Sequence, residues 1–164
     1  MIDKNISSHD AILEAGFAVF ANDPSASLAD VAAQAGVGRA TLHRYFSGRD
    51  DLMTALAKRA ADELDDAVEA ATQNAQSHMD WLHLSLGAIL PLAHRHMFLS
   101  RELIDDDALK KRHADDARQL AAVVDEAKAE GWFDPHVPTA WIVATYENLI
   151  YTGWELVEAG EATP

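Results

Sequence analysis

The chain has 164 residues, of which 49% are hydrophobic and 24% are charged, and its formal net charge is −14. This composition predicts a globular protein of one or two domains and excludes a disordered tail, a collagen-like fibre and a coiled-coil rod. Because the chain contains no cysteine, disulfides, thiolate zinc sites, iron–sulfur clusters and cysteine nucleophiles are excluded as well.

The charge is unevenly distributed along the chain. Residues 1–60 contain six basic and seven acidic residues, a balance of −1, whereas residues 61–164 contain seven and twenty, a balance of −13. Such asymmetry indicates two parts with different tasks. The acidic total argues against non-specific nucleic-acid binding, but it leaves room for a small basic surface in the first part.

The start of the sequence, MIDKNISSHD, is polar and lacks the apolar core of a signal peptide. No apolar run approaches the roughly 18 residues that are needed to span a bilayer. We therefore expect a cytoplasmic protein without a membrane segment.

Apolar residues recur at helical spacing almost throughout, and no convincing strand pattern occurs, so we predict an all-α fold. Several helix starts carry a serine followed three residues later by an aspartate, which is a capping pattern. Ser27 with Asp30 and Ser47 with Asp50 are examples. The expected helices span residues 7–22, 28–35, 38–45, 48–71, 77–94 with a bend at Pro91, 105–130 and 138–158, with one helical turn at 100–104.

Residues 27–46, SLADVAAQAGVGRATLHRYF, predict a helix-turn-helix motif, in which two short helices are joined by a turn that contains glycine. Gly36 supplies the positive φ that the turn needs, and the small Ala32 lets the two helices approach each other. Leu42 and Phe46 mark the buried side of the second helix. The opposite side presents Arg39, Ala40, His43 and Arg44, which can reach base edges or phosphates. The alternative is a helical hairpin packed inside a bundle.

Residues 12–56 resemble the DNA-binding domain of TetR-type transcriptional repressors. The family pattern is matched at Phe20-Ala21, Ala35-Gly36-Val37, Thr41-Leu42 and Tyr45-Phe46. The sequence departs from the pattern at three positions: Arg49 replaces a lysine, Gly38 replaces a serine or threonine, and His43 replaces a tyrosine.

The resemblance implies an N-terminal three-helix helix-turn-helix DNA-binding domain over residues 1–50. A long fourth helix would join it to a C-terminal helical ligand-binding and dimerisation domain over residues 51–164. The two recognition helices of a homodimer would bind the half-sites of a palindromic double-stranded operator. The expected DNA-binding residues are Ser27, Arg39, Ala40, Thr41, His43, Arg44, Tyr45 and Arg49, of which Ser27, Thr41, Tyr45 and Arg49 would hold phosphates.

The last predicted helix, residues 138–158, is apolar on nearly all sides, and such a helix must be covered on all sides. A second copy of the chain is the natural cover, and the resemblance implies that the last two helices of each subunit form a four-helix bundle. The alternative is the central helix of a monomer. The expected dimer interface consists of Ile142, Tyr146, Leu149, Ile150, Gly153 and Val157.

Aromatic and polar side chains in the acidic part predict a pocket for a small-molecule effector. One wall is expected from the helical stripe of Trp141, Thr145 and Asn148, and the opposite wall from Trp81, Ser85, Ile89 and Phe98. Glu147 and the balance of −13 favour a cationic or neutral ligand. The alternative is that the tryptophans are ordinary core residues.

We find no metal-ligand spacing, phosphate loop or nucleophile motif in the sequence. We expect no cofactor, no metal and no enzyme activity, and we expect the pair Asp115-Asp116 to be a solvated helix face. The leading hypothesis is a repressor that a small molecule releases from its operator. The alternatives are a DNA-binding regulator controlled by a protein partner and an all-helical metal-dependent enzyme.

Overall fold

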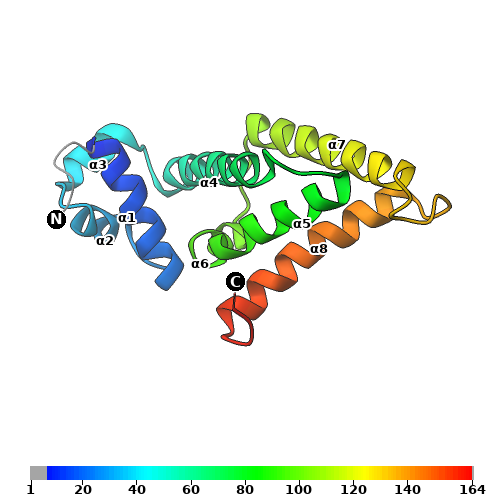
Figure 1. Ribbon diagram of the computed structural model, residues 1–164. Coiled ribbons are helices and arrows are strands. Elements are labelled where there is room, and N and C mark those ends of the chain that lie inside the picture. The colour runs from blue at the N-terminus through cyan, green and yellow to red at the C-terminus, as the bar shows by residue number, and fades with distance from the viewer. Residues whose placement is uncertain (1–6, 164) are drawn as a thin grey trace. The chain divides into compact units, whose positions relative to one another are not determined.

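The computed structural model describes residues 7–163, apart from the side chains of Ala93, His94 and Arg101, and over this range it contains helices and no strand. The predicted all-α fold is therefore confirmed. No helix in this range is long and apolar enough to cross a membrane. The helices, shown in Figure 1, are α1 (Ser8–Asn22), α2 (Leu28–Gln34), α3 (Arg39–Tyr45), α4 (Arg49–Thr72), α5 (His78–Ile89), α6 (Ala93–His96), α7 (Asp107–Ala129) and α8 (Thr139–Glu158), with 3-10 helices at Leu90–Leu92 and Met97–Arg101.

The chain forms two compact units. The first comprises the described residues up to Ala60 together with Arg95–Asp105, and the second comprises Ala61–His94 together with the described residues from Asp106 onward. The division lies inside α4, whereas the sequence suggested a domain boundary at the start of this helix. One continuous helix is therefore common to both units.

The first unit has a well-buried apolar core. Phe17 and Phe20 of α1 meet Leu52 and Leu56 of α4, and each of these side chains is at most 1% exposed. Phe98 packs on the two phenylalanine rings of α1, with centroid distances of 6.2 and 6.0 Å. Full burial of a side chain of this size contributes roughly 1.5–3 kcal/mol, so this core fixes α2 and α3 in place.

Two of the predicted helix caps show how the sequence starts its helices. Ser27 and Asp30 form the complete capping box at α2, in which each side chain accepts a hydrogen bond from the other residue's backbone N–H. At α4 the backbone N–H of Ser47 donates to the carboxylate of Asp51 at 2.8 Å, instead of the expected Asp50. The cap is displaced by one residue because α4 begins at Arg49.

The chain between α5 and α7 is broken into short segments. Helix α5 ends at Ile89, and the 3-10 turn that follows contains Pro91, which lacks the N–H needed to continue an α-helix. The predicted bend at this proline is therefore a break. The helical turn expected at residues 100–104 lies earlier, as the 3-10 helix Met97–Arg101.

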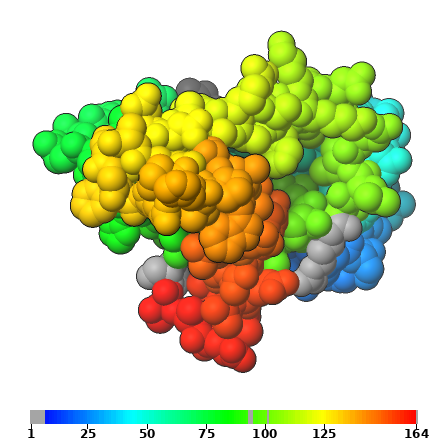
Figure 2. Space-filling model, turned by 90° about the vertical axis from the view of Figure 1, so that its right-hand side faces the viewer, coloured from blue at the N-terminus to red at the C-terminus, as the bar shows by residue number. Residues whose placement is uncertain are grey.

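In the second unit, α7 and α8 form an antiparallel pair, and α5 packs against α7 (Figure 1). Leu82 of α5 and Val124 and Ala127 of α7 are buried at the centre, with Ile142 and Tyr146 of α8 packed against them. Figure 2 shows the end of this unit, where the last turns of α7 meet the first turns of α8.

Gly36 provides a test of the turn between α2 and α3. Its φ is +67°, and an added Cβ would meet no atom within 4 Å, so only the left-handed backbone opposes a side chain. We expect Gly36→Ala to lower the free energy of unfolding by about 1–2 kcal/mol, measured by denaturant titration. Gly87→Ala is the matched control, because Gly87 also has no close neighbour but lies inside α5 without a positive φ. This control should stabilise the protein by up to about 1 kcal/mol, and equal effects of the two changes would contradict the assignment.

Candidate functional site

Helix α3 presents one buried and one exposed side. Leu42 on the inner side is 1% exposed, and Phe46 directly after the helix is 3% exposed. Both belong to the core of the first unit, together with Val31 and Ala32 of α2. The predicted buried side of α3 is therefore confirmed, and packing of this side against the core fixes the position of the helix.

The outer side of α3 carries the residues that the sequence assigned to DNA. Arg39, Ala40, His43, Arg44 and Tyr45 are exposed. The helix contains two arginines and no acidic residue. The Ala40 side chain is short, so it does not keep the helix away from a partner surface. The longer side chains of Arg39 and Arg44 project beyond it. A narrow, basic, convex surface of this kind fits the major groove of a DNA duplex.

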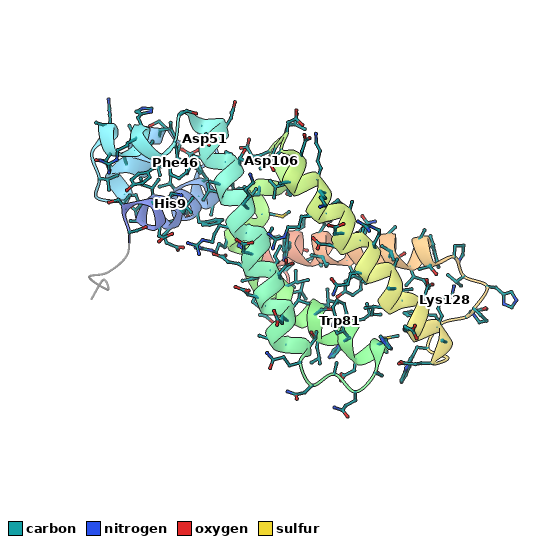
Figure 3. All side chains as sticks on the ribbon, turned by 90° about the horizontal axis from the view of Figure 1, so that it is seen from above. His9, Phe46, Asp51, Trp81, Asp106 and Lys128 are labelled. Atoms are coloured by element: carbon teal, nitrogen blue, oxygen red, sulfur yellow. The ribbon has the colours of Figure 1, made fainter. Side chains whose placement is uncertain are left out.

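Tyr45 is positioned by its neighbours. Its ring contacts His9 of α1 edge-on at a centroid distance of 5.8 Å, and the Arg44 guanidinium lies 5.1 Å from its centroid. The His9 ring also stacks on Phe46 at 5.3 Å, and both residues are labelled in Figure 3. His9 is thus a supporting residue that the sequence analysis missed, because nothing in the sequence connects it with α3.

Arg49 has partners inside its own unit. Its guanidinium donates to the carbonyl oxygens of Ala26 at 3.0 Å and Pro24 at 2.6 Å, and it lies 4.4 Å from the centroid of the Phe20 ring. A further contact joins it to Glu102 at 3.3 Å. Arg49 therefore fixes the loop before α2, and few of its donors are left for the phosphate contact that the family pattern suggested.

The remaining residues of the predicted DNA surface lie at its margin. Thr41 is half-buried, and the exposed Ser27 hydroxyl bonds to the carboxylate of its capping partner Asp30 at 2.6 Å. That hydrogen bond lowers the pKa of the Asp30 carboxyl, so Asp30 stays ionised. A shallow hollow joins Ser27 to α3; its lining residues are Ser27, Leu28, Ala29, Arg39, Leu42 and His43.

The second unit contains a cavity of about 650 Å³ between α4, α5, α7 and α8. Figure 3 places Trp81 of α5 between α4 and α7. The volume is within the range of small-molecule sites in proteins. The cavity is lined by Leu64, Asp65, Val68, Glu69, Thr72, Trp81, Ser85, Ile89, His113, Asp116, Ala117, Gln119, Leu120, Tyr146, Glu147, Ile150, Tyr151 and Trp154.

Two aromatic side chains of the cavity wall have their polar atoms bonded within the unit. The Tyr146 hydroxyl donates to the carbonyl of Leu82 at 2.9 Å and lies 2.7 Å from the hydroxyl of Ser85, which is 1% exposed. The Trp154 indole N–H donates to the carbonyl of Ile89 at 3.1 Å. These hydrogen bonds fix the orientation of the Tyr146 and Trp154 rings. Their polar atoms are already paired, so the rings can contact a ligand through their apolar faces.

The cavity is strongly acidic. Among the described residues, its lining includes four carboxylates, those of Asp65, Glu69, Asp116 and Glu147, together with His113 and no lysine or arginine. Partial burial and then the nearby Asp65 carboxylate raise the pKa of Asp116 above its ordinary value. A positive charge at this place would relieve the repulsion between the two carboxylates. Asp115 and Asp116 are both exposed, as expected of a solvated pair, and Asp116 in addition lines the cavity.

Three of the predicted pocket residues line this cavity and four do not. Trp81, Ser85 and Ile89 belong to its wall. Phe98 instead lies in the core of the first unit. The stripe of Trp141, Thr145 and Asn148 lies on the exposed side of α8.

Helix α8 turns most of its predicted dimer residues toward its own unit. Ile142 and Tyr146 pack against the central cluster, Ile150 lines the cavity, and Val157 is half-buried. A Cβ on Gly153 would lie 2.4 Å from the Leu90 side chain, so its close approach is made within the chain. Of the predicted set only Leu149 is exposed, at 51%.

The side of α8 that faces away from its own unit is mostly apolar. Trp141 is 65% exposed, and Leu149 and Leu156 lie on the same side with 51% and 39% exposure. Between Trp141 and Leu156 lie exposed uncharged residues, namely Ala144, Thr145, Asn148 and Thr152, and the exposed Glu155 follows in the last turn. A helix surface with large exposed apolar groups and no charge from Trp141 to Thr152 is unusual in a monomer.

Comparisons with known proteins agree with this geometry. The family model described as "Bacterial regulatory proteins, tetR family" matches residues 12–56, which include the helix-turn-helix and the start of α4. The transcriptional repressor LfrR of Mycolicibacterium smegmatis is 32% identical over 152 residues, covering 92% of this chain and 79% of LfrR. The chain belongs to the TetR family.

Solved structures show the same fold. The crystal structure of the TetR-like regulator LfrR from Mycobacterium smegmatis, in complex with proflavine, has a TM-score of 0.77 and 30% identity, covering 96% of this chain and 86% of that chain. The fatty acid degradation regulator FadR from Bacillus halodurans has a TM-score of 0.77 at 18% identity, covering 99% of this chain and 90% of that chain, and shows the fold alone.

Membership of the TetR family favours the two regulator hypotheses drawn from the sequence over the enzyme. The protein is a DNA-binding transcriptional regulator with a helix-turn-helix domain, and it is not an enzyme. TetR regulators bind operator DNA and act as dimers, and repression that a small molecule relieves is typical of the family.

Proposed function

We propose that this TetR-family protein is a repressor that binds its operator through α3 and is released by a flat aromatic cation. The observation that carries the ligand class is the lining of the cavity, which combines aromatic rings with four carboxylates and, among the residues that the structure describes, has His113 as its one basic residue. LfrR, the relative with 30% identity, has been crystallised with proflavine, which is itself a flat aromatic cation. As a DNA-binding regulator, the protein would act in the cytoplasm.

On DNA, the exposed side of α3 would enter the major groove. Arg39 and Arg44 reach furthest from the helix and would contact guanine edges or phosphates. Ala40 would allow close approach, and His43 would reach a base or phosphate beside it. Tyr45, held by His9, would contact a phosphate, with Thr41 and Ser27 at the margin. We assign Arg49 to the support of the loop before α2.

A homodimer would bind a palindromic operator, with one α3 in each half-site. We propose that the exposed side of α8, around Trp141, Leu149 and Leu156, forms the centre of the subunit contact, with α7 beside it. This replaces the set inferred from the sequence. The support is that this side carries no charge from Trp141 to Thr152, with Glu155 following only in the last turn, although the chain as a whole has a net charge of −14.

DNA binding and ligand binding would be separated between two parts of the chain that meet at α4. We propose that residues 1–50 bind DNA and that residues 51–164 bind the effector and the second subunit. The support is the separation of charge: the residues up to 60 are close to neutral, and the strongly acidic remainder would repel the DNA backbone.

Arg44→Ala should weaken binding to the operator by about 1–3 kcal/mol if Arg44 contacts a base. The operator can be selected from fragments of the host's own DNA, and affinity measured by fluorescence anisotropy on it and on a scrambled duplex. Arg118→Ala on α7, where the arginine pairs with Asp115, is the control and should have no effect. Equal weakening on both duplexes would instead make Arg44 a phosphate contact.

Leu149→Glu should dissociate the dimer, because it places a charge on the uncharged side of α8. Sedimentation velocity would then report a monomer, and operator binding would fall as well. Leu103→Glu introduces the same change at a fully exposed leucine in the first unit, and it should leave the dimer intact. A dimeric Leu149→Glu protein would refute this interface.

Proflavine should bind to the second unit and lower the affinity for the operator. Asp116→Asn should weaken proflavine binding by about three- to tenfold, since it removes a charge from the cavity wall. The raised pKa of Asp116 gives a sign for the pH dependence. Because protonation neutralises this carboxylate, the affinity should fall as the pH is lowered toward its pKa, and the fall should be smaller in Asp116→Asn.

The control for this prediction is Asp115→Asn, which changes the neighbouring carboxylate that does not line the cavity. It should leave proflavine binding close to that of the unmodified protein in a fluorescence titration. If both variants behaved alike, the cavity would not be the binding site.

A further inference from the structure

An ion triad joins α4 to α7 beside the cavity. The Arg112 guanidinium of α7 lies between two carboxylates of α4, at 2.6 Å from Asp62 and 2.5 Å from Asp65. Arg112 itself is mostly covered, with 28% of its side chain exposed. Both carboxylates raise its pKa, so Arg112 is a permanent positive charge at this place. One guanidinium therefore forms ion pairs with two successive turns of α4 and links this helix to α7.

Asp65 belongs both to the triad and to the cavity. It is one of the lining residues, whereas Asp62 and Arg112 are not. Asp116, one helical turn after Arg112 on α7, lines the cavity as well and is close enough to feel the charges of Asp65 and Arg112. The Arg112 guanidinium neutralises Asp65 in the structure. A ligand cation in the cavity would contact the same carboxylate.

We infer that Arg112 is the internal cation that a positively charged ligand displaces from Asp65, and that this displacement loosens α4 from α7. The inference rests on the proposed function. A cation seated between Asp65 and Asp116 competes for the Asp65 carboxylate, whose side chain is 57% exposed, and it repels the guanidinium because like charges at close range repel each other even where water screens them. A neutral aromatic ligand would fill the cavity without breaking the triad.

The consequence for DNA binding follows from the continuity of α4. Its first half contributes Leu52 and Leu56 to the core that holds α3, and its second half carries Asp62 and Asp65. A change in how the second half is held is therefore transmitted along the helix itself. By linkage, any ligand that favours the loosened state weakens operator binding by the same factor by which the operator weakens ligand binding.

Arg112→Gln tests the inference with proflavine as the probe. Removing the competing charge should tighten proflavine binding by about three- to tenfold in a fluorescence titration. Because the ion triad is already broken in this variant, its operator affinity without ligand should be lower than that of the unmodified protein. The further loss of operator affinity on adding proflavine should also be smaller.

Three variants control this experiment. Arg112→Lys keeps the charge and should restore near-normal proflavine binding, which also guards against a folding defect in Arg112→Gln. Asp65→Asn in the Arg112→Gln background should abolish the gain in proflavine affinity, because the carboxylate for which Arg112 and the ligand compete is then absent. Arg118 lies on the same helix, pairs with Asp115 and does not line the cavity. Arg118→Gln should therefore leave both proflavine binding and operator binding unchanged.

The outcomes separate this inference from the proposed function. If the unmodified protein bound no proflavine, the proposed ligand class would fail and the inference with it. If the unmodified protein bound proflavine and lost its operator, while Arg112→Gln bound proflavine no more tightly or responded to it in full, only the inference would be overturned. Tighter binding together with a reduced operator response supports it.

Discussion

A single helix supplies apolar side chains to two separate packed regions, and the behaviour of the protein depends on this constraint. Leu52 and Leu56 of α4 lie in the core of the first unit, while Leu64 and Val68, further along the same stripe, form part of the cavity wall in the second. Because an α-helix is stiff over this length, its two ends cannot be adjusted independently. A ligand that alters the packing around Leu64 and Val68 therefore acts on an element that the DNA-binding unit needs for its own stability.

The distribution of charge gives the two units opposite electrostatic roles. The exposed side of α3 has two arginines and no acid, whereas the described lining of the cavity has four carboxylates and neither lysine nor arginine. An acidic surface repels DNA phosphates, which agrees with the proposed DNA contact through the basic surface of α3. The same excess of acid lowers the electrostatic potential in the cavity, which agrees with the proposed cationic ligand.

The sequence predicted the helix-turn-helix well, because short-range chemistry specifies it. Gly36 has the expected positive φ, Ser27 and Asp30 form the expected capping box, and Leu42 is buried. Helix α8 was harder, since it is apolar on nearly all sides and its periodicity does not tell which side meets its own unit. The residues expected to line the cavity from α8 therefore lie on its exposed side, and most of those expected at the subunit contact pack inside the unit or line the cavity. The sequence analysis did not single out Asp65 and Arg112, and it described Asp116 only as a solvated residue, because acids and bases on long helices look alike until the fold brings α4 and α7 together.

The uncovered surface around Trp141 has a consequence for the life of the protein before it meets DNA. A newly made single chain would expose a large indole and two leucines to water, and such a patch adheres to other apolar surfaces. Pairing of two chains would hide it, so the thermal stability should depend on how much protein is present. A regulator produced in few copies per cell would then spend part of its time as separate, less durable subunits, and degradation of these subunits would set a lower limit on the concentration at which the repressor persists.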